Sequence, residues 1–329
     1  MSGLDILYFI IPSAILYATP LIFTAIGGVF SERAGVVNIG LEGIMVVGAF
    51  TGIYVNLEYG EAMGSNVIWF AILASLVAGS VFSLLLAVAA VSFRADQTVT
   101  GVALNMLGAA VTIFLVKLIY DKGQTDMIAN SIQRFEMDGF ELWGINWFPL
   151  ADIPFFGPLL FQNVYSTSIL AFVVAIVAWF VIYKTPFGLR LRAVGEHPMA
   201  ADTMGVNVTK MRYIAVLISG ALGGIGGAVY AQTITLDFSA STIAGQGFMA
   251  IAAVIFGKWH PIGALGAALF FGVAQTLSIA GNQIKYIQDI PSVYLQILPY
   301  VLTILALAGF IGKAIAPKAS GTPYIKGKR

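Results

Sequence analysis

Long apolar segments separated by short charged groups dominate the pattern of hydrophobic and polar positions along the chain. A transmembrane helix needs about 20 consecutive apolar residues, and most of the segments approach or exceed that length. We therefore predict an all-α transmembrane bundle of nine spans. The segments cover residues 4–30, 35–57, 66–93, 98–120, 165–183, 213–236, 245–256, 262–281 and 291–312. The seventh is short, and residues 237–244 before it are expected to form a re-entrant or interfacial piece.

The composition excludes several other classes of protein. Hydrophobic residues make up 59% of the 329 residues and charged residues 10%, whereas about 25% of a soluble domain is charged. The chain has no cysteine and only two histidines, His197 and His260, which argues against disulfides and against a thiolate or histidine metal centre. The net charge is +1 without a basic run, so a nucleic-acid partner is not expected. The amino terminus lacks the basic region of a cleavable signal peptide, so the first span is expected to stay in the mature protein.

The distribution of lysine and arginine predicts the orientation, because loops rich in these residues stay in the cytoplasm. With nine alternating spans and the carboxyl terminus inside, thirteen of the seventeen basic residues fall on the cytoplasmic side. We therefore expect the amino terminus outside and the carboxyl terminus inside. The prediction is one transmembrane domain, residues 1–329, with an outer loop at 121–164, an inner loop at 184–212 and a cytoplasmic tail at 313–329. The basic residues left outside are Lys117, Lys122, Arg134 and Lys285.

The outer loop mixes acidic residues with large aromatic ones, including Trp143, Trp147 and Phe148. Aromatic anchors beside acidic residues suit the docking of an external protein. An interfacial aromatic belt joined to a solvated linker explains the composition equally well, so both interpretations stay open. Residues 147–161 allow one further interpretation. In it, they form a segment that dips into the membrane, which would change the helix count.

The inner loop contains a predicted short helix between Glu196 and Gly205. Pro198 stands at the start of this helix and Gly205 just past its end, which are the expected positions for these residues. A helix of about two turns is not stable alone in water. One interpretation is therefore that it is stabilised by fitting into a groove on a cytoplasmic partner. The alternative is an ordinary connector that obeys the positive-inside rule.

Asn38 and Glu42 are predicted to lie on one face of the second helix, because they are four positions apart. If that helix starts near Gly35, Glu42 lies about 10 Å along it, where an ionised carboxylate costs at least about 2.5 kcal/mol. Glu42 must therefore face protein or water. It is either a gate or pathway residue, or a clamp that hydrogen-bonds Asn38 or another helix.

Three further regions of the apolar segments contain polar or small residues, and in the fourth span these form a stripe at helical spacing. In the fourth span the stripe indicates either a tight helix–helix seam or the wall of a polar passage, and the sequence favours the seam. Five glycines in the sixth span indicate close packing or a hinge, with packing favoured. Single amides in the later spans could line a cavity for an uncharged hydroxylated solute. The stripe in the fourth span is Thr98, Gly101, Asn105, Ala109 and Thr112; the glycines are Gly220, Gly223, Gly224, Gly226 and Gly227; the amides are Gln232, Gln246, Gln275 and Gln296.

Two longer motifs carry a family resemblance. SERAGVVNIGLEG at residues 31–43 and GLRLRAVGEHPMAADTMGV at residues 188–206 resemble the permease subunits of ATP-binding cassette (ABC) importers. The branch that they resemble is the simple-sugar and nucleoside group, related to branched-chain amino acid permeases, and the first motif is most similar to nucleoside permeases. GVALNML at 101–107 and FMAIAAVIFGKWHPIGALGAALFFG at 248–272 are compatible with the same family. Members of this family commonly have eight to ten helices.

The resemblance implies how the chain works. The short inner helix would couple to a cytoplasmic ABC ATPase, and a second permease subunit, generally a different chain, would complete the pathway. An extracytoplasmic solute-binding lipoprotein would deliver a nucleoside or simple sugar at the plasma membrane. The implied coupling residues are Arg192, Gly195, Glu196, Pro198, Ala200, Ala201, Met204 and Gly205, and the candidates for the pathway or gate are Asn38, Glu42, Asn105 and Gln246.

The chain itself is not expected to be an enzyme. It contains no GxxxxGK[ST] phosphate loop, no HExxH motif and no plausible nucleophilic triad, so no catalytic residue, cofactor or metal is predicted. ATP and Mg²⁺ would be bound by the partner ATPase. Two alternative functions stay open: an ion-coupled secondary transporter that uses Glu42, and a membrane scaffold that packs other subunits without transporting a solute.

Overall fold

The structure is a computed structural model that describes residues 3–135, 140–142, 145–147, 150, 153–280, 294, 297, 301 and 315–326. The predicted helical class is confirmed. The long helices are α1 (Gly3–Arg33), α2 (Leu41–Met63), α3 (Val67–Ala87), α4 (Gln97–Tyr120), α5 (Ser166–Lys184), α8 (Val208–Tyr230) and α10 (Pro261–Ala280). The shorter elements are α6 (Pro186–Glu196), α7 (Pro198–Thr203), α9 (Gln246–Phe256), the 3-10 turn η1 (Gly64–Asn66) and the π-helical turns η2 (Val88–Ser92), η4 (Gly157–Phe161) and η5 (Ala231–Thr235).

Six stretches of the described residues are long and apolar enough to cross a membrane. One of them, Leu41–Ser92, has 52 residues, about 78 Å of helix against a hydrocarbon core of about 30 Å. It turns at η1, and the Ser75 hydroxyl of α3 donates to the Gly48 carbonyl of α2 at 2.9 Å, so the two helices lie side by side. Helix α9, with 11 residues, is too short to span alone. The predicted ninth segment, 291–312, falls almost entirely outside the described residues, so the count of nine spans stays a prediction.

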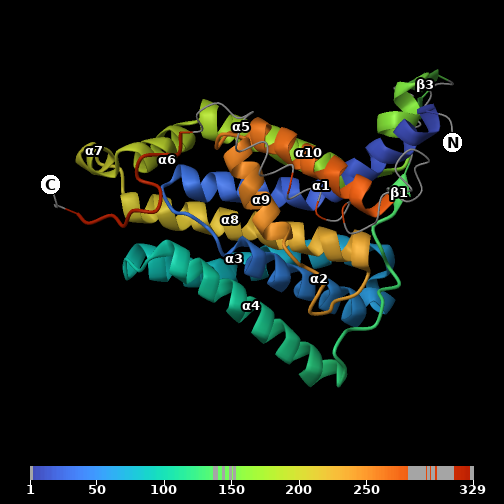
Figure 1. The fold of residues 1–329 in the computed structure, drawn as a ribbon, viewed down its shortest axis with the longest axis horizontal. Coiled ribbons are helices and arrows are strands. Elements are labelled where there is room, and N and C mark those ends of the chain that lie inside the picture. Colours follow the sequence, from blue (N-terminus) through green and yellow to red (C-terminus); the bar gives the residue numbers. More distant parts are fainter. Residues whose placement is uncertain are drawn as a thin grey trace.

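Helix α8 lies at the centre of the bundle, between α1 and the α2–α3 pair (Figure 1). In its most apolar stretch 72% of the residues are buried, against 22–39% in the other candidate spans. Its glycines permit this packing. A Cβ on Gly227 would overlap the carbonyl oxygen of Met45 in α2, and a Cβ on Gly224 would overlap that of Ser75 in α3. The glycines of the sixth predicted span therefore pack backbones closely.

The predicted start of the second helix is wrong. Helix α2 begins at Leu41 rather than near Gly35, so Glu42 lies in its first turn and Asn38 lies in the preceding loop. The loop is held by side chains from other parts of the chain. The Val37 N–H donates to Gln97 Oε1 at 2.7 Å, and the Ser31 hydroxyl donates to the Val36 carbonyl at 2.6 Å. These contacts replace the backbone hydrogen bonds that a helix would have made.

Short strands lie in the outer loop of this mostly helical chain. They were not predicted from the sequence, which indicated an interfacial aromatic belt with a linker, or a loop that docks an external protein. Strand β1 (Arg134–Phe135) pairs antiparallel with β4 (Val164–Tyr165), and β2 (Phe140–Leu142) pairs antiparallel with β3 (Ile145–Trp147). Before β1 the chain runs along the segment after α8, where the Thr125 N–H donates to the Phe238 carbonyl at 2.9 Å. In Figure 1, β1 lies near the start of α1 and away from α7.

Most of the described basic residues gather at the end of the bundle formed by α6, α7 and the carboxyl-terminal residues 315–326, which we call the basic end. Arg33 bonds the Lys258 carbonyl there, and Arg212 bonds the Thr322 carbonyl. Arg134, which the prediction placed outside, lies at the other end and donates to the Tyr165 hydroxyl. The start of α1 and residues 315–326 lie at opposite ends of the molecule (Figure 1). The orientation of these two ends relative to a membrane stays a prediction.

Candidate functional site

The inner loop contains two helices rather than one. The predicted short helix is α7, with Pro198 in its first turn and Gly205 just beyond it at φ +82°. The chain also forms α6, which the sequence analysis missed. Thr185 caps its first turn by accepting from the Gly188 N–H at 3.2 Å, and Pro186 is its first residue. Threonine followed by proline is a helix-start signal, so this pair could have revealed α6.

The predicted coupling residues divide into buried and exposed groups. Ala201 is 5% exposed and belongs to the main apolar core, so it holds α7 on the bundle. Met204 is 84% exposed, and Ala200 and Gly205 are exposed as well. A partner that docks on α7 would therefore meet Ala200, Met204 and Gly205.

The remaining coupling candidates connect α6 and α7 to the rest of the basic end. The buried Gly195 lies against the backbone carbonyl of Arg33 at the end of α1, and its own carbonyl accepts from the Ala319 N–H at 2.9 Å. Arg192 lies over the Tyr183 ring of α5, with its guanidinium carbon 4.8 Å from the ring centre. Glu196 and Pro198, at the junction of α6 and α7, are half-buried. A displacement of this loop would thus reach α1 and α5 directly.

Glu42 joins α2 to α9. Its two carboxylate oxygens accept from the backbone N–H groups of Gly245, at 2.5 Å, and Gly247, at 2.6 Å. Gly245 is the N-cap of α9 and has φ +97°, a conformation that favours glycine. A carboxylate at a helix N-terminus satisfies free N–H donors and opposes the positive end of the helix dipole. The geometry is that of an interhelical clamp, one of the two alternatives for Glu42.

Asn38 and Asn105 lie on either side of the start of α2. Asn105 of α4 accepts from the Gly43 N–H at 2.8 Å and donates to the Ile39 carbonyl at 3.0 Å. The buried Asn38 donates to the Ser219 hydroxyl of α8 at 2.9 Å. Its side-chain oxygen is buried with no hydrogen-bond partner among the described residues. Asn105 therefore joins the start of α2 to α4, and Asn38 joins the preceding loop to α8. The Asn38 acceptor is unused within the described part of the chain.

Two of the five predicted positions of the fourth-helix stripe, Gly101 and Asn105, lie in a seam against the start of α2 and the loop before it. A Cβ on Gly101 would meet Ile39, and one on Gly108, which is not part of the stripe, would meet the Gly43 backbone. Thr112 is buried and bonds its own helix. Thr98 is exposed and does not take part.

The amides of the later spans do not converge on one cavity within the described residues. Gln246, at the start of α9, accepts from the Ala244 N–H and donates to the Tyr230 hydroxyl. Gln232 in η5 accepts from Asn56 at 3.2 Å, near the outer loop. Gln275 is half-buried in α10, and Gln296 lies outside the described residues. Of the four pathway candidates, Asn38, Glu42 and Asn105 surround the start of α2, and Gln246 joins them through the N-terminus of α9.

A further polar cluster was not predicted from the sequence, although all of its members except Tyr183 lie in the motifs at 31–43 and 248–272. The Trp259 indole N–H donates to the buried carboxylate of Glu32, and Arg33 donates to the Trp259 carbonyl at 2.7 Å and the Tyr183 hydroxyl at 3.0 Å. The His260 ring packs against the Tyr183 ring at a tilt of 37°, with ring centres 4.7 Å apart. Burial lowers the pKa of His260, and the nearby Arg33 guanidinium lowers it further. The cluster fixes the end of α1 to the turn between α9 and α10.

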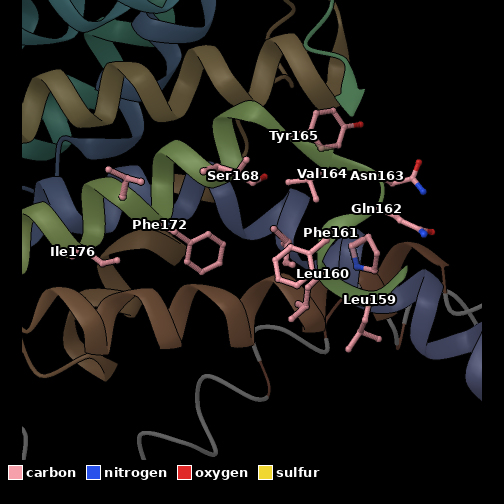
Figure 2. Close-up of a pocket in the computed structure, with 14 residues that line it drawn as sticks. Leu159, Leu160, Phe161, Gln162, Asn163, Val164, Tyr165, Ser168, Phe172 and Ile176 are labelled. Atoms are coloured by element: carbon pink, nitrogen blue, oxygen red, sulfur yellow. The ribbon is translucent and has the colours of Figure 1, made fainter. Parts of the chain in front are cut away.

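An apolar pocket of about 350 Å³ lies between α1, η4 and α5 (Figure 2). Leu160, Phe161 and Phe172 face it, while Gln162 and Asn163 lie at one side. None of the predicted pathway residues lines it. The pocket is therefore separate from the polar contacts around α2 and α9.

Six stretches of the described chain that are long and apolar enough to cross a membrane, packed against one another through glycines, define a multi-pass membrane protein. The comparison with protein families agrees, because residues 10–307 match the family described as branched-chain amino acid transport system / permease component. The chain belongs to this family of multi-pass membrane permeases.

The chain is similar to several relatives that carry the names of ABC transporter permeases. The guanosine ABC transporter permease protein NupQ of Bacillus subtilis is 60% identical over 329 residues, which cover 100% of both chains. The nucleoside ABC transporter permease protein NupC of Lactococcus lactis is 50% identical over 328 residues, again covering 100% of both. A second Bacillus subtilis protein, the guanosine ABC transporter permease protein NupP, is 24% identical over 88% of this chain and 77% of its own length.

Proposed function

We propose that the chain is a permease subunit of an ABC importer that carries nucleosides across the plasma membrane. The main support is the identity of 60% with NupQ over the full length, together with the 50% identity with NupC. ATP and Mg²⁺ are bound by a separate cytoplasmic ATPase, and an external lipoprotein delivers the nucleoside.

The geometry of the basic end supports the coupling role. Helix α7 exposes Ala200 and Met204 while Ala201 anchors it. The loop after α7 leads directly into α8, the most buried span. A push on α7 by the closing ATPase is therefore passed to the centre of the bundle, and through the contact between Gly195 and Arg33 to α1.

The second permease subunit is a different chain in this proposal. NupQ and NupP come from the same strain and carry the same transporter name, and both are similar to this chain, one closely and one distantly. A divergent pair of this kind fits two unlike subunits around one pathway. In this proposal, the polar residues around the start of α2 are the contribution of this subunit to the gate of the shared pathway.

Reconstitution tests this function. Vesicles that contain the chain with its second permease and ATPase, supplied with binding protein outside and ATP inside, are expected to accumulate labelled guanosine. Vesicles with this chain alone should neither hydrolyse ATP nor concentrate the solute. Uphill uptake by the chain alone, abolished by Glu42→Gln, would instead identify a secondary transporter. Complete assemblies without uptake of any nucleoside would refute the proposed substrate class.

A further inference from the structure

Residues 315–326 are fixed to the coupling loop by backbone contacts. The Ala319 N–H donates to the Gly195 carbonyl at 2.9 Å, and the Lys318 N–H lies 3.5 Å from a carboxylate oxygen of Glu196. Further along, the Thr322 carbonyl accepts from the Arg212 guanidinium at 3.0 Å. Arg212, on α8, is only 1% exposed, so residues 315–326 also cover a buried cation. This part of the chain therefore belongs to the folded basic end.

The same residues complete a polar groove of about 760 Å³ beside α7. One wall is the turn between η2 and α4, which carries Arg94. The second wall is the end of α7 and the start of α8, with Asp202 and Lys210. Tyr324 and Lys326 form the third. Residues 315–326 thus supply one of the three walls of the groove.

The charges of the groove are unbalanced within the described chain. Arg94, Lys210 and Lys326 are exposed, and none of them forms an ion pair with another described residue. Asp202 is the one carboxylate among the lining residues, and it interacts with Tyr324, whose pKa is raised by burial and by this carboxylate. Three cations in a concave surface create a positive potential that favours an acidic ligand.

The surroundings of the groove suit a protein. Met204, next to the lining residue Gly205, is 84% exposed, and Phe93, next to Arg94, is 79% exposed. Large apolar side chains beside a charged surface are typical of protein interfaces, where apolar anchors are surrounded by polar residues. Because α7 is the proposed contact of the ATPase, the same partner reaches the groove.

We infer that residues 315–326 form part of the ATPase-docking surface, and that the groove they complete receives an acidic segment of the ATPase. The inference rests on the proposed function and adds a second, electrostatic contact to the one made by α7. Opposite charges at such a contact accelerate association and select the partner. They also make binding sensitive to salt.

The test measures binding of the purified ATPase to the detergent-solubilised permease pair at low and high salt. We expect the variant with Arg94→Glu, Lys210→Glu and Lys326→Glu to lose at least about tenfold in affinity at low salt. Its remaining binding should change little with salt. Since all three side chains are exposed, the thermal stability of the variant should match that of the parent. Arg190→Glu is the matched control, because Arg190 is exposed on α6 and lies outside the groove.

The outcomes separate this inference from the proposed function. If the parent pair binds the ATPase and the triple variant binds equally well at both salt concentrations, the groove inference is wrong while the function stands. If the triple variant instead loses bound phosphatidylglycerol and keeps ATPase affinity, the groove is a lipid site and the inference is again wrong. If the parent pair does not bind the ATPase, the proposed function itself fails.

Discussion

The carboxylate of Glu42, in the first turn of α2, accepts a hydrogen bond from the backbone N–H of Gly247, 205 positions later in the chain. With the matching bond from Gly245, this contact makes one side chain the cap of another helix. Both helices belong to the bundle, so the bond couples the start of α2 to the short helix α9. The relationship also shows how an acidic residue is accommodated in an apolar chain.

Replacing Glu42 by Gln should destabilise the bundle. Glutamine has a single acceptor oxygen, so its amide group would face one of the two N–H donors. A hydrogen bond to a charged group contributes about 1.5–3 kcal/mol to the free energy of unfolding. We therefore expect Glu42→Gln to lower this free energy by about 2 kcal/mol. Thermal unfolding of the detergent-solubilised protein measures it. The control is Glu58→Gln, an exposed position on the same helix, and equal melting temperatures for the two variants would contradict the clamp.

Trp259→Phe should also destabilise the bundle, because it too removes a hydrogen bond to a carboxylate. The substitution removes the indole donor and leaves the buried Glu32 carboxylate without this bond. The free energy of unfolding should fall by about 1–3 kcal/mol as a result. Adding Glu32→Gln should recover part of the loss, because a neutral amide costs less to bury than an unpaired charge. A double-mutant cycle based on unfolding temperatures gives the coupling. Trp69→Phe, at an exposed tryptophan of α3, serves as the control, and additive effects of Trp259→Phe and Glu32→Gln would count against the pair.

The glycine seam of α8 predicts a sharp contrast between two alanine substitutions. Gly227→Ala would place a methyl group on the Met45 carbonyl, and overpacking of this kind costs about 1–3 kcal/mol. Gly266→Ala on α10 meets nothing within 4 Å and should stabilise its helix by up to about 1 kcal/mol. Melting temperatures that move in opposite directions are expected. A neutral Gly227→Ala would show that α8 can shift away from α2 without cost.

Charged substitutions on α7 should separate docking from folding. Ala200→Asp changes an exposed position, so it should weaken ATPase binding and leave thermal stability unchanged. Ala201→Asp buries a carboxylate in the core, so it should lower the melting temperature as well as the binding. Binding and melting assays on both variants test this. Unaltered ATPase binding by Ala200→Asp would remove α7 from the interface.

The stability of the bundle should fall below pH about 6.5, the ordinary pKa of histidine. Because the pKa of His260 is lowered in the folded protein, the unfolded chain takes up a proton at a higher pH than the folded chain does. Folding stability is therefore fully present above pH about 6.5 and decreases on acidification. His260→Gln should flatten this part of the curve of melting temperature against pH, and an unchanged slope would assign the effect to other groups.

The sequence predicts the helices well and their contacts poorly, for a physical reason. Apolar runs long enough to cross a membrane have few alternatives to a helix, so α1, α4, α5 and α10 lie within a few residues of the predicted ranges. The loop before α2 is apolar too, and its hydrophobicity resembles that of a helix. One of the contacts that hold this loop comes from Gln97, whose side chain accepts from the Val37 N–H sixty positions away. A single sequence does not contain that information.

The same distinction applies to the candidate site. The motif around Pro198 and Gly205 encodes its own helix through local backbone preferences, and α7 forms there. The exposure of each position is a property of the packed bundle, so the burial of Ala201 could not be predicted. Likewise, the sequence left two interpretations of Glu42 open, a clamp or a gate. The N–H donors at the start of α9 are identified only by the fold, because they lie more than 200 positions away.

The position of Lys326 has a practical consequence for anyone who purifies this protein. An acidic epitope tag placed next to Lys326 would lie beside the groove and compete there with a natural ligand. A tag fused ahead of α1 emerges at the opposite pole of the molecule (Figure 1). Amino-terminal fusions are therefore the sound choice for assembling the complex.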